Sequence, residues 1–411
     1  MNYNTHTLNN GLRIIHLPCH GEVVYCGYAV AAGTSDELAG EEGLAHFCEH
    51  MTFKGTDRLS SIQIINTLER VGGELNAFTT KEETFYYSAI LRQHFDKAVR
   101  LLTDIVFHST YPQHEIDKEM EVVCDEIESY RDSPAELIYD EFENRIFHGH
   151  PMGHNVLGDK DTVRGFKSED CKRFTQRLYR PDNAVFYVYG DIDFKQLTKK
   201  LNILSGEKKE GEIIRCDKTF EGVKDELLGK RENDEEQQTH QAHVMIGTAF
   251  GKDLEKWRIP LYLTNNILGG PSMNSRLNLE LREKRGLVYT VESIMTSYTD
   301  SMLWTVYFGC DPHDVNRCIR LVKSQLTKLR NTPLSPTALA NAKQQIKGQI
   351  ALASENRENY AISMAKQYLH RGTLKSNERL YKRIDDVKVE DIHQLANEVL
   401  NEDRLFTLVF S

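Results

Sequence analysis

The chain has 411 residues, more than one hydrophobic core usually supports, which indicates two or three domains. Hydrophobic residues make up 40% of the chain and the mean hydropathy is negative, a composition that excludes a disordered or a membrane-spanning protein. The formal net charge of −10 argues against nucleic acid as the main partner. Because the first residues lack a basic segment followed by an apolar one, no signal peptide is visible, and we expect a cytoplasmic protein.

The first half of the chain alternates between strand-like and helix-like segments. Residues 12–33 are predicted as paired strands, and the stretch 74–91, rich in Thr, Phe and Tyr, as two more. A strand over 183–192 closes this half. Apolar residues at helical spacing predict helices over 62–71, 94–109, 114–131, 135–147 and 168–179.

The second half repeats this order of elements. It contains strands near 243–251, 288–299 and 303–310 and helices over 259–270, 275–284, 315–329 and 338–353. Between the halves, residues 205–238 are highly charged and poor in apolar residues, which predicts an exposed and partly flexible linker. We therefore predict a duplicated α+β fold, with a first domain over 1–204 and a second over 239–411. Each domain is expected to be a mixed β-sheet with helices packed on one face.

The segment GLAHFCEHMTFKGT in the first half contains the pattern H-x-x-E-H. On a helix, His46 and His50 lie one turn apart on one face and can bind the same metal ion, while Glu49 is close enough to act on a water molecule beside it. The alternative is an amphipathic helix that happens to carry these residues. No H-x-x-E-H occurs after residue 200, and Gln349 aligns with Glu126 of the first half, so we predict one catalytic and one non-catalytic half.

A zinc ion bound by two histidines usually takes a carboxylate as its third protein ligand. The predicted helix over 114–131 carries several carboxylates. Glu119 and Glu126 lie seven residues apart, which is two turns, so both can face the H-x-x-E-H helix. The alternative is a solvated acidic face, the better interpretation for Glu121 and Glu128. Composition and spacing leave the choice between Glu119 and Glu126 open.

Three segments together resemble the pitrilysin/insulinase family of zinc peptidases: HFCEHMTFKGT, GGELNAFT and EMEVVCDE. The resemblance covers essentially the whole chain, and the two-domain length is similar to the small branch that includes mitochondrial processing peptidase subunits and bacterial relatives. It implies one zinc ion per chain with His46, His50 and Glu126 as ligands. It also implies Glu49 as the base and Glu119 as a carboxylate that supports the site.

The same resemblance extends to residues that contact substrate. SRLNLELREKRGLVYTV is similar to a family segment whose Arg and Tyr bind substrate, here Arg282 and Tyr289. Without that match, a surface Arg and a strand Tyr is the simpler interpretation. Asn76 and Ala77 match the family's edge strand, which offers unpaired backbone groups to an extended peptide.

We therefore expect a zinc-dependent endopeptidase that cleaves peptides or unfolded segments. By family analogy it is a homodimer that encloses a chamber, with Arg282 and Tyr289 of one subunit serving the zinc ion of the other. The alternatives are a non-catalytic assembly subunit and a subunit that needs a different partner chain. The cluster of His148, His150 and His154 lies among Gly and Pro residues that suit a turn, which we favour over a second metal site.

Overall fold

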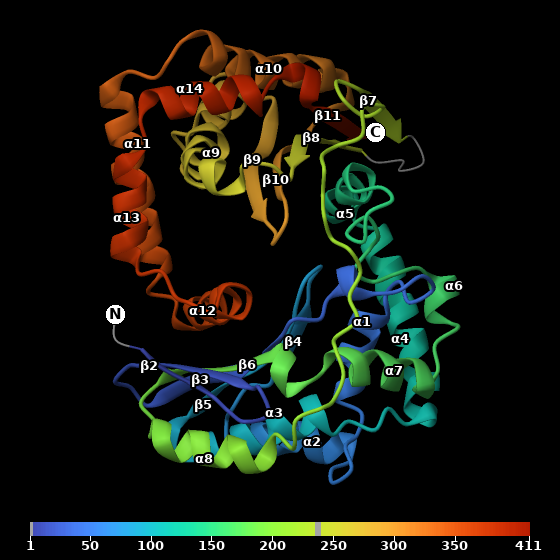
Figure 1. Ribbon diagram of the computed structural model, residues 1–411. Coiled ribbons are helices and arrows are strands. Elements are labelled where there is room, and N and C mark those ends of the chain that lie inside the picture. Colours follow the sequence, from blue (N-terminus) through green and yellow to red (C-terminus); the bar gives the residue numbers. More distant parts are fainter. Residues whose placement is uncertain (1–2, 235–239) are drawn as a thin grey trace. The chain divides into compact units, whose positions relative to one another are not determined.

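The computed structural model describes residues 3–234 and 240–411 (Figure 1). The chain forms two compact units. The first comprises the residues up to Glu128, His154–Asp217 and Ala353–Leu374, and the second comprises Ser129–Gly153, Lys218–Leu352 and Lys375–Ser411. The division predicted from the sequence, with boundaries at 204 and 239, assigns 129–153 and 353–374 to the opposite domains.

The first unit contains a six-stranded sheet in the order β1-β2-β6-β3-β5-β4. Strands β2 and β6 pair in parallel and all other neighbours pair antiparallel, so the sheet is mixed, as predicted. β4 lies at one edge of the sheet, and β5 is its one partner among the described strands. The strands are β1 (Asn4–Thr7), β2 (Arg13–Pro18), β3 (Val23–Val30), β4 (Asn76–Thr79), β5 (Thr84–Leu91) and β6 (Ala184–Gly190).

Helices cover one face of this sheet and bury a large apolar cluster against it, because apolar residues recur at helical spacing along them. A further helix, α12 (Arg357–Arg371), packs against β3 and β6 and contributes to a second apolar cluster with residues of β2, β3, β5 and β6. The first unit also contains α1 (Leu44–Thr52), α2 (Ser61–Glu69), α3 (Phe95–Phe107), most of α4 (Gln113–Arg131), α6 (Lys160–Val163), α7 (Ser168–Leu178) and α8 (Phe194–Leu204).

The second unit is built on a five-stranded sheet in the order β7-β11-β8-β10-β9. It is also mixed, because β7 and β11 pair in parallel and the other neighbours antiparallel. The predicted fold class, two mixed sheets with packed helices, is confirmed. The unit contains α5 (Pro134–Ile146), β7 (Arg231–Asp234), β8 (Ala242–Phe250), α9 (Leu254–Gly269), a π-helix (Asn278–Glu283), β9 (Val288–Ser297), β10 (Met302–Cys310), α10 (Val315–Asn331), α11 (Pro336–Ala353), α13 (Asn377–Asp386), α14 (Val389–Glu398) and β11 (Phe406–Phe410).

The two halves of the chain exchange one helix each. α12 belongs to the C-terminal half in sequence but to the first unit in space, and α5 belongs to the N-terminal half but packs against β8 and β11 of the second sheet. Both helices cover sheet faces that would otherwise expose apolar side chains such as Tyr187 and Leu408, each about 1% exposed or less.

Part of the predicted linker is ordered into the second sheet. Arg231–Asp234 forms β7, which pairs in parallel with β11 at the sheet edge. Phe220 is 7% exposed and belongs to the apolar cluster under α5. Residues 235–238 of the predicted linker lie outside the described residues.

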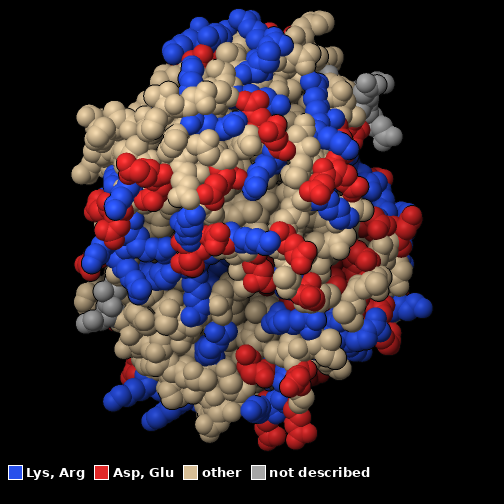
Figure 2. Space-filling view, turned by 45° about the horizontal axis from the view of Figure 1, so that its top comes forward, with Lys and Arg blue, Asp and Glu red and all other residues tan. Residues whose placement is uncertain are grey.

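The surface carries charges of both signs. Figure 2 shows Lys and Arg interspersed with Asp and Glu across one face. Among the helices described, none has the length and apolar character needed to cross a bilayer.

Candidate metal centre

His46 and His50 lie one turn apart on α1, with their ring centroids 4.6 Å apart. α4 brings Glu126 to the same place. Its Oε2 atom lies 3.8 Å from Nε2 of His46 and 3.4 Å from Nε2 of His50. One ligand atom of each of the three residues lies within 4.8 Å of the others, so a single metal ion could contact all three.

The donor set fits a zinc ion in its chemistry as well as its geometry. Nδ1 of His50 lies 3.0 Å from Oε1 of Glu119, to which it can donate a hydrogen bond, and this leaves Nε2 free to bind a metal. Burial lowers the pKa of His46 to about 3, and the nearby His50 acts in the same direction, so the imidazole of His46 is neutral and can offer a lone pair. Burial alone would lower the pKa of His50, but the hydrogen bond to Glu119 and the charge of Glu126 outweigh it and raise the pKa, so a bound metal ion would take the place of the Nε2 proton. Two imidazole nitrogens and one carboxylate are a usual zinc ligand set.

The supporting carboxylate is itself held by a cation. Glu119 is 7% exposed, and its Oε2 lies 2.5 Å from Nζ of Lys54. Burial alone would raise the pKa of Glu119, but the contacts with His50 and Lys54 outweigh it and lower the pKa. Glu119 therefore stays ionised beside His50. The contact with Lys54 could not be read from the sequence, because no spacing rule links residue 54 to α4.

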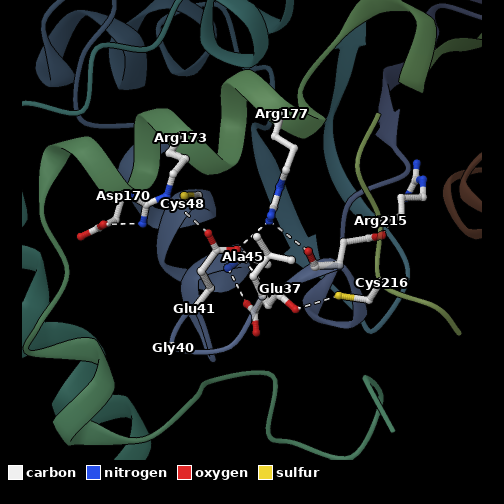
Figure 3. A network of polar contacts seen from close by, with 12 residues as sticks. Glu37, Gly40, Glu41, Ala45, Cys48, Asp170, Arg173, Arg177, Arg215 and Cys216 are labelled. Atoms are coloured by element: carbon white, nitrogen blue, oxygen red, sulfur yellow. Dashed lines mark hydrogen bonds and ion pairs between the residues drawn. The ribbon is translucent and has the colours of Figure 1, made fainter. Parts of the chain in front are cut away.

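The loop before α1 anchors the helix that carries both histidines (Figure 3). The buried carboxylate of Glu37 accepts hydrogen bonds from the backbone N–H groups of Gly43 (3.0 Å) and Ala45 (2.7 Å), which would otherwise be unpaired at the start of the helix. Arg177 of α7 reaches the same loop through Oε2 of Glu41, at 2.6 Å. These contacts fix where α1 begins and hence where His46 projects.

Glu49 lies beside the histidines but outside the group of three converging residues. Its side chain is 9% exposed, and its Oε2 accepts a hydrogen bond from Oγ1 of Thr79 at 2.5 Å. Burial raises the pKa of Glu49, and the hydrogen bond from Thr79 opposes that rise. Sequence reasoning missed Thr79. The available signal was its place at the end of the NAFT stretch, two residues beyond Ala77.

The other predicted site residues fall in two places. Asn76 and Ala77 lie on β4, whose second edge has no neighbouring strand among the residues that the structure describes, and Asn76 is exposed. Arg282 and Tyr289 lie in the second unit, where the guanidinium of Arg282 is 5.8 Å from the centroid of the Tyr289 ring. Tyr289 is 80% exposed and therefore free to contact a ligand.

The histidines of the loop over 148–154 have other contacts. Nε2 of His154 lies 2.7 Å from Oε2 of Glu37, and the ring of His150 packs against Phe147 and Phe220. A second group with metal-binding residue types, Glu82, Glu83 and His370, has its own neutralising contacts, since Glu83 also pairs with Lys366.

Comparison with protein families covers both halves of the chain. Residues 19–160 match the model of the insulinase family, peptidase family M16, and residues 165–346 match the model of the peptidase M16 inactive domain. Solved structures share the fold, among them the following two. A protease from Helicobacter pylori has a TM-score of 0.92 and 22% identity, covering 100% of this chain and 99% of that one. A putative M16-like peptidase from Alicyclobacillus acidocaldarius has a TM-score of 0.86 and 19% identity, covering 100% and 98%.

Curated relatives extend over nearly the full length. A Bacillus subtilis protein called "uncharacterized zinc protease YmxG" is 31% identical over 407 residues, covering 98% of this chain and 97% of the relative. A Rickettsia bellii protein called "uncharacterized zinc protease" is 30% identical over 406 residues, covering 97% and 95%. With family models matching both halves and relatives similar over almost their whole length, this chain belongs to the peptidase M16 (insulinase) family.

Proposed function

We propose that this protein is a zinc-dependent endopeptidase that cleaves peptides or unfolded segments. The observation that carries the proposal is the convergence of His46, His50 and Glu126, from two helices, on one point beside the buried carboxylate of Glu49. A zinc ion held by these three residues would supply Lewis acidity toward a scissile carbonyl. The zinc protease names of the relatives support the same chemistry.

Glu49 is proposed as the base. Its carboxylate is buried, and burial raises its pKa. Glu49 therefore binds a proton more readily near neutral pH than an ordinary glutamate does. It would take a proton from the attacking water and deliver it to the leaving amine. Glu119 would hold His50 in position and touch no substrate, so it is a positioning residue.

β4 is proposed to bind the substrate backbone. Asn76 and Ala77 lie on its unpaired edge, where an extended peptide can add as a further strand through main-chain hydrogen bonds. Recognition through the backbone favours extended or unfolded segments over folded proteins. We propose that Arg282 and Tyr289 also contact the substrate, Arg282 through carbonyl or carboxylate groups and Tyr289 through the oxyanion.

We further propose a cytoplasmic homodimer that encloses a chamber. One half of each chain carries the H-x-x-E-H pattern and the other half carries Arg282 and Tyr289, so two chains together could pair the two sets of residues. The alternative is a non-catalytic or partner-dependent subunit of a larger processing complex. The presence of all of His46, Glu49, His50 and Glu126 favours the enzyme, since a purely structural subunit has no need of them.

Metal analysis and peptide digestion test the proposal together. The purified protein is expected to bind about one zinc ion per chain and to cleave peptides in a mixture, with products identified by mass spectrometry. Chelation should abolish cleavage, and added zinc should restore it. A purified protein that binds zinc but cleaves no peptide at any oligomer size would favour the non-catalytic subunit.

A further inference from the structure

The turn that joins β4 to β5, residues 80–83, is held by a helix from the far end of the chain. Glu83 is 1% exposed, and its two carboxylate oxygens have separate partners on α12. Nζ of Lys366 lies 2.5 Å from Oε1, and Nε2 of His370 lies 2.7 Å from Oε2. A carboxylate buried this deeply needs such partners, because an unpaired charge away from water is costly.

The opposite side of the turn is held by the loop after β3. The backbone N–H of Thr34 donates to the carbonyl of Thr80 at 3.1 Å, and that of Ser35 donates to the carbonyl of Lys81 at 2.8 Å. Gly33 makes this approach possible, since a Cβ atom there would lie 2.5 Å from the carbonyl oxygen of Thr80. The turn is therefore fixed between the loop after β3 on one side and α12 on the other.

The position of the turn over residues 80–83 determines where the preceding residue, Thr79, lies. Thr79 is the last residue of β4 and pairs with Thr84, the first residue of β5, with their hydroxyl oxygens 3.3 Å apart. Thr80 closes the turn through hydrogen bonds from its N–H and its hydroxyl to Glu83, at 2.8 and 3.0 Å. The hydroxyl of Thr79 donates in turn to Glu49 at 2.5 Å.

We propose that Glu83, clamped by Lys366 and His370, is a positioning residue that holds the β4–β5 turn so that Thr79 orients the carboxylate of Glu49. This inference rests on the proposed peptidase function. It gives the exchanged helix α12 a role in catalysis. Lys366 and His370 of this helix would help to orient Glu49, the proposed base, which lies in the first half of the chain. It also joins the orientation of Glu49 to the position of β4, the strand proposed to bind substrate.

Variants of Thr79 test the hydrogen bond from Thr79 to Glu49. Thr79→Val removes the hydroxyl while keeping the shape, and we expect kcat for a fluorogenic peptide to fall about tenfold, the size of one hydrogen bond to a charged group. Thr79→Ser keeps the hydroxyl and should restore kcat to within about twofold of the original. Zinc content should be unchanged in both variants. Equal kcat in Thr79→Val and the unmodified protein would overturn the inference.

A double-mutant cycle tests whether Glu83 acts through Thr79. Glu83→Gln should lower kcat alone but have little further effect in the Thr79→Val background, because the contact it supports is already gone. Asp104→Asn is the matched control, since Asp104 is a buried carboxylate of the same unit whose hydrogen-bond partner is Thr56. Its effect should add to that of Thr79→Val. Additive effects for Glu83→Gln would mean a merely structural role and would overturn the inference.

Hydrogen exchange gives a readout that does not depend on activity. Glu83→Gln should speed amide exchange in residues 76–84, and Asp104→Asn should leave these amides unchanged. If Glu83→Gln is unfolded at the assay temperature, Lys366→Met removes one partner of the clamp and takes its place in the cycle. Unchanged exchange in a folded clamp variant would overturn the inference. An inactive unmodified protein would instead refute the proposed function, so the two failures are distinguishable.

Discussion

The Nδ1 atom of His50 lies 3.0 Å from Oε1 of Glu119, on the side of the ring away from Glu126. Glu119 of α4 therefore orients the imidazole, and Glu126 of the same helix faces its other nitrogen. Two residues two turns apart on one helix thus have different surroundings. Glu119 is buried and paired with Lys54, while Glu126 is more exposed and faces both Nε2 atoms. This difference in environment favours Glu126 as the metal ligand and Glu119 as its support.

We predict that Glu119→Gln weakens zinc binding about 10- to 100-fold without abolishing it, because an amide orients and polarises His50 less well than a carboxylate. Competition with a chelator of known affinity measures the change. Glu121→Gln is a matched control on the same helix, as Glu121 is exposed and outside the site. Complete loss of zinc in Glu119→Gln would indicate that Glu119 is itself a ligand.

Glu49→Gln should retain zinc and lose turnover. The amide keeps the shape of the side chain but cannot accept the proton of the attacking water, so we expect kcat to fall by roughly 10²- to 10⁴-fold. Zinc content and the melting temperature should stay close to those of the original protein. Turnover that persists in Glu49→Gln with its metal bound would refute the role of Glu49 as the base.

The part of the site that the sequence predicted follows from local periodicity. His46 and His50 are four residues apart and Glu119 and Glu126 seven apart, and such spacings place side chains on one face of any helix. The choice between the two glutamates came from the family resemblance, since spacing alone cannot show which turn of α4 meets α1. The family model match and the structure agree with the predicted fold class.

The contacts that the sequence did not predict are those between distant segments. Thr79 and Glu49 are 30 residues apart, and Glu83 and His370 are 287 apart, and no local pattern marks either pair. The exchange of α5 and α12 was missed for the same reason. A helix with an apolar face must pack on something, but its sequence does not say which of two similar sheets it will cover.

The Glu83 clamp predicts a pH dependence of stability. Burial would raise the pKa of Glu83, but the hydrogen bond from His370 and the charge of Lys366 outweigh it and hold the pKa at about 2. The folded-state pKa lies below the unfolded value of about 4.3. The ionised Glu83 therefore adds its full contribution to the free energy of unfolding above pH ~5, and this contribution is lost as the pH falls toward 2. The contribution is on the order of 3 kcal/mol in the free energy of unfolding.

Denaturant unfolding at several pH values measures this contribution. Glu83→Gln should be less stable than the original protein at pH 7, and the difference between the two should shrink as the pH falls from 5 toward 3. Asp104→Asn again serves as the comparison, because its difference from the original protein carries no contribution from the clamp. A stability difference for Glu83→Gln that stays constant over this pH range would contradict the clamp.

The proposed homodimer predicts complementation between two inactive variants. Glu49→Gln lacks the base but keeps Arg282, and Arg282→Ala keeps the base but lacks the substrate contact. If Arg282 serves the zinc site of the other subunit, a mixed dimer contains one complete site, and random mixing should restore about a quarter of the original activity. If Arg282 serves its own subunit, every site in the mixture stays defective.

Arg285→Ala is the control for Arg282→Ala, because Arg285 lies three residues away and pairs with Glu280 at 2.7 Å. Peptide cleavage measured after dissociation and reassociation of the two variants, with the oligomer size followed by light scattering, distinguishes these arrangements.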